Sequence, residues 1–179
     1  MTREKQKPAM KKTAPARSQK KLRIGWFSFS CCEDSTIMLM ELLNDRFFSW
    51  MKYIDICYAK VLRKEGDMKN LDIAFVEGAI AGEHQEEMLK KIRQNSKKLV
   101  AIGSCAVTGL PSGQRNDFSD AVKKEISYAT KTSTYRKKVV PIHEIVKVDE
   151  SVPGCPMNEK VFLATLQKLA KEFGVDAQF

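Results

Sequence analysis

The chain has 179 residues, of which 43% are hydrophobic and 30% are charged. This composition supplies the core of one domain and excludes a wholly disordered or collagen-like chain. The first apolar run begins only near Leu22, and no apolar run reaches the length of a membrane span. We therefore expect no transmembrane helix and no secretory signal, and a cytoplasmic protein.

The net charge of +9 is concentrated at the N-terminal end of the chain. Residues 1–23 carry nine basic residues and one acid, which accounts for +8 and leaves the remainder almost neutral. Residues 1–20 also contain Pro8 and Pro15 and almost no large apolar residues, so we predict a disordered basic arm. A solubilising extension, or an arm that wraps a partner subunit, is favoured over a tail that binds nucleic acid or anionic lipid.

Residues 21–179 alternate between segments typical of strands and segments typical of helices. In chain order we expect a strand over 21–29, a helix over 36–44 with Ser35 as its N-cap, a strand over 53–61, and a strand in 71–80 that ends at Gly78. A helix over 84–95, a strand over 98–106, a helix over 120–129, a short edge segment over 138–142, and a helix over 159–173 closed by Gly174 follow. This order predicts an α/β fold with a parallel sheet and helices on both faces. In such sheets, sites form outside the carboxyl ends of the strands.

The five cysteines fall into two groups. Cys57 lies inside an apolar predicted strand and is expected to be a small buried hydrophobe. The other four, Cys31, Cys32, Cys105 and Cys155, lie at predicted strand ends or in turns with Gly and Pro neighbours. There, backbone amides can point at an anionic ligand.

Four thiolates could hold either a zinc ion or an iron–sulfur cluster. Structural zinc usually takes its ligands as two short-spaced pairs. Here an adjacent pair is followed by single cysteines after 72 and then 49 intervening residues. This spacing favours a 4Fe–4S cluster over zinc.

Four motifs in this order resemble a known family: residues 31–35 (CCEDS), 76–78 (VEG), 101–109 (AIGSCAVTG) and 148–156 (VDESVPGCP). The chain is similar, from about Leu22 to Gly174, to the small subunit of nickel–iron hydrogenases. The wider superfamily includes the 20 kDa iron–sulfur subunit of respiratory complex I. The resemblance implies a flavodoxin-like fold that holds one proximal 4Fe–4S cluster against a large partner subunit.

Departures from the family pattern help to distinguish the hydrogenase branch from the complex I branch. Hydrogenase small subunits usually begin with Cys-x-Gly-Cys, whereas here Phe29 stands at the first position and Cys31 at the glycine. Adjacent cysteines are the complex I pattern, so the ligands implied are Cys31, Cys32, Cys105 and Cys155. The residues 33–35 and the insert near 110–140 look like soluble multi-subunit hydrogenases, and residues 156–158 lack the complex I proline–arginine continuation.

The resemblance therefore favours an electron-transfer subunit of a soluble nickel–iron hydrogenase, and so part of an oxidoreductase. The Ni–Fe site would lie in the large subunit, because this chain has no further Cys-x-x-Cys pairs. Electrons would pass between that site and further iron–sulfur or flavin subunits of a heteromultimer, with no nucleic acid involved. The alternative is the quinone-proximal 4Fe–4S subunit of a complex I-like NADH dehydrogenase. From a different class, a zinc-structured or nucleic-acid-binding module stays open.

Two acids flank the cluster motifs, and no catalytic residue is expected in this chain. Glu33 and Glu77 are candidates for a proton relay or for contact with the partner. A helix cap or a loop hydrogen bond is the favoured interpretation for each of them, because acids near helix starts are common.

Overall fold

The computed structural model describes residues 20–127 and 135–179. The basic arm expected over residues 1–20 lies outside the described residues except for Lys20. The last two residues of the helix predicted over 120–129 lie outside them as well. Within the described part of the chain, no helix is long and apolar enough to cross a membrane.

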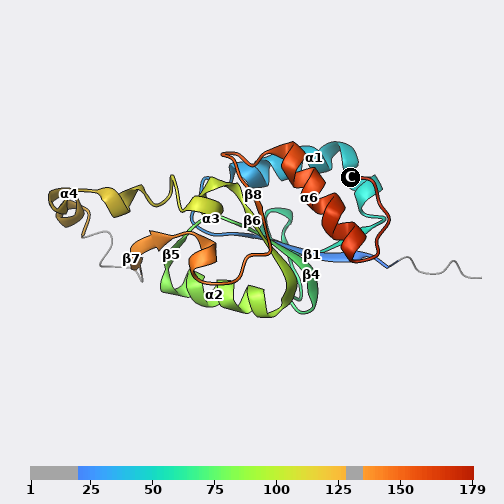
Figure 1. Cartoon of the computed structure of the whole chain (residues 1–179), viewed down its shortest axis with the longest axis horizontal. Helices are drawn as coiled ribbons and strands as arrows, with labels where there is room; N and C mark the ends of the chain where they lie inside the picture. Colours follow the sequence, from blue (N-terminus) through green and yellow to red (C-terminus); the bar gives the residue numbers. More distant parts are fainter. Residues whose placement is uncertain (1–19, 128–134) are drawn as a thin grey trace, which may run out of the picture.

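Five parallel strands form the centre of the molecule (Figure 1). They are β1 (Leu22–Ser28), β2 (Ile54–Ala59), β4 (Leu71–Glu77), β6 (Ser96–Ile102) and β8 (Glu150–Val152). The short strand β3 (Lys64–Glu65) pairs antiparallel with β2, which gives the order β3-β2-β1-β4-β6-β8. Counting only the parallel strands, this is the flavodoxin-like order 2-1-3-4-5. The predicted fold class is therefore confirmed.

Helices cover both faces of this sheet (Figure 1). Helices α1 (Asp34–Trp50) and α6 (Glu159–Glu172) lie on one face, and α2 (Glu83–Gln94) lies on the other. The core accordingly has two parts. Trp26 and Phe75 of the sheet pack with Phe162 of α6 on the α1–α6 face, and Leu89 and Ile92 of α2 pack against the opposite face.

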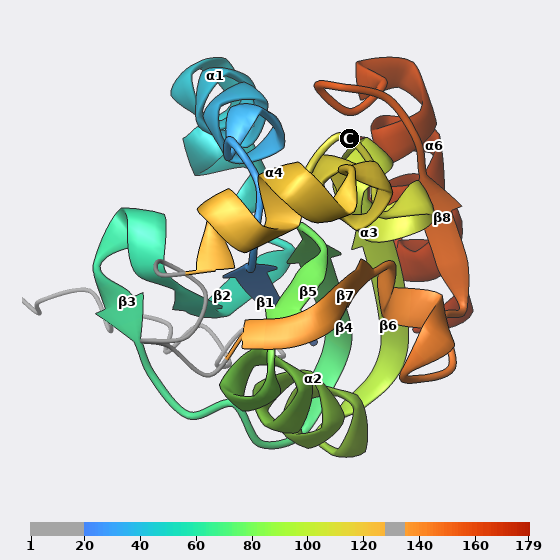
Figure 2. The ribbon, with the colours of Figure 1, turned by 90° about the vertical axis from the view of Figure 1, so that its left-hand side faces the viewer.

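The insert near 110–140 extends from the carboxyl end of the sheet. It follows α3 (Gly103–Thr108) and contains the short helices η2 (Gln114–Asp117) and α4 (Asp120–Glu125). Its return strand β7 (Tyr135–Val140) pairs antiparallel with β5 (Ile80–Gly82) in a separate small sheet. Figure 2 looks onto this end of the molecule, where α4 and β7 lie in front of the parallel strands. The 3-10 turn η3 (Ile142–Glu144) leads back to β8.

Several predicted elements differ from the observed ones. The strand predicted to end at Gly78 does so, since Gly78 turns the chain with φ +93°, but the residues after it form a further strand, β5. The predicted strand 98–106 ends at Ile102, where Gly103 with φ +77° starts α3, so Cys105 lies in a helix. Helix α1 runs to Trp50, and Ser35 lies inside its first turn, not at its N-cap, which is Glu33. The strand β8 was not predicted.

Candidate functional site

Three segments at the carboxyl edge of the sheet carry the four predicted ligand cysteines. Cys31 and Cys32 follow β1, Cys105 lies in α3 directly after β6, and Cys155 follows β8. All four line one pocket, although they come from widely separated parts of the sequence. Cys57 lies within β2 and does not line this pocket.

The cysteine pocket is open on one side. Cys105 is buried, with 5% of its surface exposed, and Cys31 is half-buried. Cys32 and Cys155 are exposed. A ligand held by these four sulfurs would therefore be enclosed by the fold on the side of Cys105 and accessible on the side of Cys32 and Cys155.

Two glycines allow the loops to approach this closely. A Cβ on Gly103 would lie 3.0 Å from the Ser35 hydroxyl oxygen, and one on Gly154, at φ +119°, would lie 2.5 Å from the Pro156 carbonyl oxygen. Both backbone conformations are ones that residues with a side chain rarely adopt. The loops are also hydrogen-bonded, since the Ser104 N–H donates to the Gly154 carbonyl over 2.7 Å.

A buried carboxylate fixes the start of α1 beside the pocket. Glu77, at the end of β4, is only 3% exposed. Its carboxylate accepts hydrogen bonds from the Ser35 backbone N–H over 3.0 Å and from the Thr36 hydroxyl over 2.6 Å. The Thr36 oxygen in turn accepts from the Trp26 indole N–H over 2.7 Å. Glu77 thus satisfies an N–H of the first helical turn that has no partner within the helix.

Glu33 is placed differently from Glu77. Its backbone occupies the N-cap position in the left-handed region, at φ +64°, and its side chain is exposed. Within the described residues, the Glu33 carboxylate makes no capping hydrogen bond to the helix.

Burial, and to a lesser degree the charge of Glu77, raise the pKa of the Cys31 thiol to about 12. Burial likewise raises the pKa of Cys57, to about 11. A raised pKa therefore does not separate the candidate ligands from the cysteine in β2. Binding of a metal group to Cys31 would have to displace its proton, which makes such binding favourable at higher pH.

A residue of the insert reaches the cysteine pocket, which the sequence did not reveal. The Ser112 hydroxyl lies 3.1 Å from the Cys105 sulfur and 2.8 Å from the Ser30 carbonyl oxygen. The hydroxyl has a single proton, for which the Ser30 carbonyl and the sulfur of one candidate ligand are both within reach as acceptors. The turn residues around Ser112 were visible in the sequence, but nothing in their pattern indicated that the insert folds back onto Cys105.

The donor set fits an iron–sulfur cluster. Four soft sulfur ligands face one pocket, and glycine turns and a hydroxyl donor surround them, which is the setting in which such clusters are held. Among the residues that the structure describes, no group of three or more His, Cys, Asp or Glu side chains could hold a single metal ion.

The flavodoxin-like sheet and the convergence of four cysteines at its carboxyl edge define an α/β domain with a cysteine-lined pocket. Residues 31–169 match the family described as the 20 kDa subunit of NADH ubiquinone oxidoreductase, and the chain belongs to this family. The superfamily resemblance drawn from the four motifs is thereby confirmed.

Several curated relatives are described as hydrogenase subunits. The chain is 29% identical over 157 residues to a subunit of the F420-non-reducing hydrogenase of Methanocaldococcus jannaschii, covering 78% of this chain and 53% of the relative. It is 23% identical over 170 residues to the delta subunit of the NAD-reducing hydrogenase HoxS of Cupriavidus necator, covering 86% and 81%. The chain spans about half the length of several of its curated relatives.

A solved structure of an NAD+-reducing NiFe hydrogenase in the H2-reduced state has the same fold. One of its chains superimposes with a TM-score of 0.73 at 24% identity, covering 89% of this chain and 96% of that chain. This likeness shows that the two chains share a fold.

The role of Glu77 in holding α1 can be measured against Glu33. We expect Glu77→Gln to lower the free energy of unfolding by about 1–3 kcal/mol, because the amide NH2 leaves one of the two buried donors without an acceptor. Glu33→Gln changes an exposed side chain and should stay within about 0.5 kcal/mol of the parent. Urea unfolding followed by circular dichroism measures both. Equal effects of the two substitutions would contradict this account of the helix start.

Proposed function

We propose that this chain is the electron-transfer subunit of a soluble, cytoplasmic, multi-subunit nickel–iron hydrogenase. In this proposal Cys31, Cys32, Cys105 and Cys155 hold one 4Fe–4S cluster. The observation that carries it is the convergence of these four cysteines, from three separate segments, on one pocket. The relatives' descriptions as hydrogenase subunits support the assignment of the reaction.

A bound 4Fe–4S cluster supplies one-electron transfer, at a potential set by burial, nearby charge and hydrogen bonds to its sulfurs. The chain's own residues supply these influences. Cys105 holds the buried side, the Ser112 hydroxyl lies within hydrogen-bonding reach of its sulfur, and the Glu77 carboxylate places a negative charge nearby. Glu77 also fixes the loop that carries Cys31 and Cys32 through its bonds to the start of α1.

Hydrogen activation belongs to a partner in this proposal. The described cysteines are accounted for by the cluster pocket and by Cys57 in β2, so the Ni–Fe site would lie in a large subunit. The exposed side of the pocket, at Cys32 and Cys155, is the face through which an electron would enter or leave. Further iron–sulfur or flavin subunits would be the next carriers.

A second function is favoured by one specific observation. The adjacent cysteines Cys31 and Cys32 follow the complex I pattern, and the matching family bears the description of a complex I subunit. The alternative is therefore the quinone-proximal 4Fe–4S subunit of a complex I-like NADH dehydrogenase. It uses the same four ligands and differs in its partners.

The ligand set is tested by single serine substitutions. We expect Cys31→Ser, Cys32→Ser, Cys105→Ser and Cys155→Ser each to lower the iron and sulfide content or to convert the cluster, because serine replaces a soft thiolate. Cys57→Ser is the matched control and should retain about four irons and four sulfides per chain. Metal and sulfide analysis with EPR on anaerobically purified protein gives the readout. Loss of the cluster in Cys57→Ser but not in Cys31→Ser, or one zinc without sulfide in the parent, would overturn the assignment.

Ser112 is expected to raise the reduction potential of the cluster, because a hydrogen bond to sulfur stabilises the more negative, reduced state. Ser112→Ala should therefore lower the midpoint potential by up to about 60 mV, which corresponds to a tenfold change for one electron. An EPR-monitored redox titration measures the shift. Ser112→Thr, which keeps the hydroxyl, and Ser49→Ala, an exposed serine at the far end of α1, should leave the potential near that of the parent. If the midpoint potential is unchanged in Ser112→Ala while the iron content is intact, Ser112 does not tune the cluster.

The two candidate functions differ in what accompanies the chain from its native source. We expect it to co-purify with a nickel-containing large subunit, and to be poorly soluble or cluster-deficient when expressed alone. Affinity purification followed by mass spectrometry and nickel analysis tests this. Recovery with proton-pumping membrane subunits and without nickel would favour the complex I alternative, and a stable, cluster-loaded monomer without any large subunit would contradict both.

A further inference from the structure

The insert carries a local excess of positive charge. Residues 110–140 contain seven basic and three acidic residues, a net charge of +4. Residues 1–23 account for +8 of the total of +9, so the rest of the chain is left at −3. The insert is therefore a basic projection on a domain that is otherwise slightly acidic. It lies at the same end of the sheet as the cysteine pocket (Figure 2).

A groove in the insert concentrates this charge. It has a volume of about 400 Å³ and lies among η2, the end of α4 and the start of β7. Six of the described residues line it, of which four are basic and none is acidic: Arg115, Lys123, Ile126, Tyr135, Arg136 and Lys137. Like charges that are held together repel one another, and an anion in the groove relieves that repulsion.

Two of these cations have no acidic counterpart in the chain. Arg136 pairs with Glu86 of α2, whereas the Lys123 and Lys137 ammonium groups make no hydrogen bond or ion pair with any described residue. In the sequence, the segment 128–134 between α4 and β7 contains Lys131 and no acidic residue, so it adds no negative charge. The charges of Lys123 and Lys137 are therefore left for an external anionic group.

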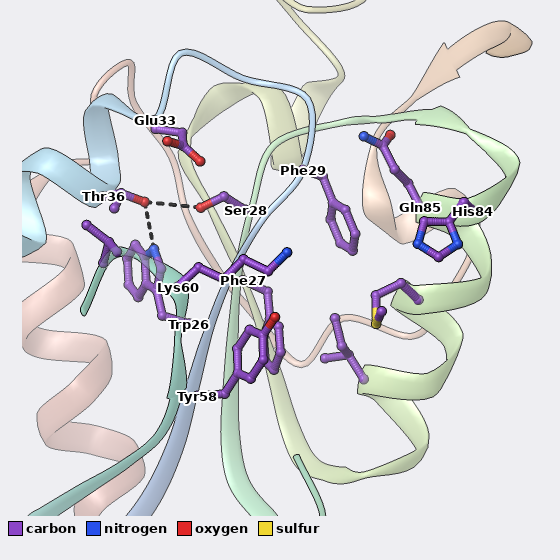
Figure 3. A pocket seen from close by; sticks show the side chains of 13 residues that line it. Trp26, Phe27, Ser28, Phe29, Glu33, Thr36, Tyr58, Lys60, His84 and Gln85 are labelled. Atoms are coloured by element: carbon purple, nitrogen blue, oxygen red, sulfur yellow. Dashed lines mark hydrogen bonds between the residues drawn. The ribbon is translucent and has the colours of Figure 1, made fainter. Parts of the chain in front are cut away.

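The walls of the groove are fixed to the body of the domain. The Arg115 guanidinium donates to the carbonyl oxygens of Ala81 and Arg136 over 3.4 and 2.8 Å, and it lies 5.6 Å from the centroid of the Tyr135 ring. The Ala81 N–H donates to the Gln85 side-chain oxygen over 2.8 Å, and Figure 3 shows Gln85 at the start of α2, beside a separate cavity. A ligand therefore meets walls that are already in place, which reduces the ordering cost of binding.

Apolar groups accompany the cations. Tyr135 and Ile126 line the groove, and Val122, one helical turn before Ile126, is 38% exposed. A phosphate backbone offers nothing apolar to these side chains, and the −3 charge of the rest of the chain repels a long polyanion. A protein segment that carries both carboxylates and apolar side chains matches both features of the groove.

We propose that this groove binds an acidic segment of a partner protein. Its carboxylates lie against Lys123 and Lys137, and an apolar side chain lies against Val122 and Tyr135. Charge complementarity of this kind speeds association and selects the partner, and its effect falls as salt screens it. The groove uses none of the four cysteines, so the site does not depend on the proposed cluster.

The test uses a fluorescein-labelled peptide of repeated Glu-Glu-Leu units and the matched Gln-Gln-Leu peptide, which lacks the charge. Each is titrated with the full-length protein, and the fluorescence anisotropy is followed. We expect saturable binding of the acidic peptide, about tenfold tighter than that of the neutral one at low salt and weaker as salt is raised. Lys123→Gln combined with Lys137→Gln should remove this advantage and leave binding of the neutral peptide unchanged.

Matched controls separate the groove from charge and apolar surface elsewhere in the chain. Lys11→Gln combined with Lys12→Gln makes the same charge change near the N-terminus and should leave the affinity for the acidic peptide within about twofold of the parent. Val122→Ser should weaken that peptide several-fold, whereas Val161→Ser on α6, an equally exposed valine at 38%, should not. Circular dichroism checks that each variant is folded.

Equal binding of the acidic and neutral peptides would overturn the proposal. So would an equal loss of affinity in the Lys123–Lys137 and the Lys11–Lys12 double variants, because the groove would then make no contribution of its own. A short DNA duplex is titrated in the same way. If the duplex binds more tightly than the acidic peptide and loses that binding in the Lys123–Lys137 double variant, the groove is a nucleic-acid site and not a peptide site.

Discussion

The position of the cysteine pocket depends on one buried carboxylate. Glu77 is removed from water, and burying a charge is costly unless hydrogen bonds compensate for it. Its partners are the Ser35 N–H and the Thr36 hydroxyl, so the end of β4 is tied to the first turn of α1. The loop between β1 and α1 has little freedom once both of its ends are fixed, and this loop carries Cys31 and Cys32. The carboxylate thereby orients half of the candidate ligand set without touching it.

Hydrogen bonds also connect the segments that carry Cys105 and Cys155 to the start of α1. The Ser35 hydroxyl accepts from the Met157 N–H over 3.2 Å, and the Ser104 N–H donates to Gly154 over 2.7 Å. The start of α1 therefore contacts the segment after β8 through the Ser35 hydroxyl, and the segments after β6 and β8 contact each other through backbone groups. The pocket is formed by the fold itself, which reduces the ordering cost of placing four sulfurs around a cluster.

The sequence predicted the parts of this molecule that depend on local patterns. Apolar strands, amphipathic helices and glycine-flanked cysteines follow from periodicity and turn chemistry, so the parallel sheet and the candidate ligands could be named in advance. The three-residue strand β8 carries Glu150 and Ser151 and has no apolar run, so nothing local marks it. Its strand character comes from pairing with β6, a contact between distant segments. The Ser112–Cys105 contact is likewise tertiary and leaves no pattern in the sequence.

Charged and hydrogen-bonding groups near the cysteine pocket act in opposite directions on the reduction potential of a bound cluster. How strongly each charge acts depends on how deeply it is buried. Glu33 and Asp34 are exposed, so solvent and salt screen their charges. Glu77 is buried, so its charge acts on Cys31 through protein and raises the pKa of that thiol in addition to the effect of burial. A negative charge disfavours adding an electron to a nearby cluster, whereas the Ser112 hydroxyl favours it. In the proposed function the Glu77 carboxylate, which fixes the pocket, therefore also lowers the reduction potential of the cluster. The Ser112 hydroxyl from the insert offsets part of that effect. The insert thus bears on the chemistry of the site through one hydroxyl, although it supplies none of the four cysteines.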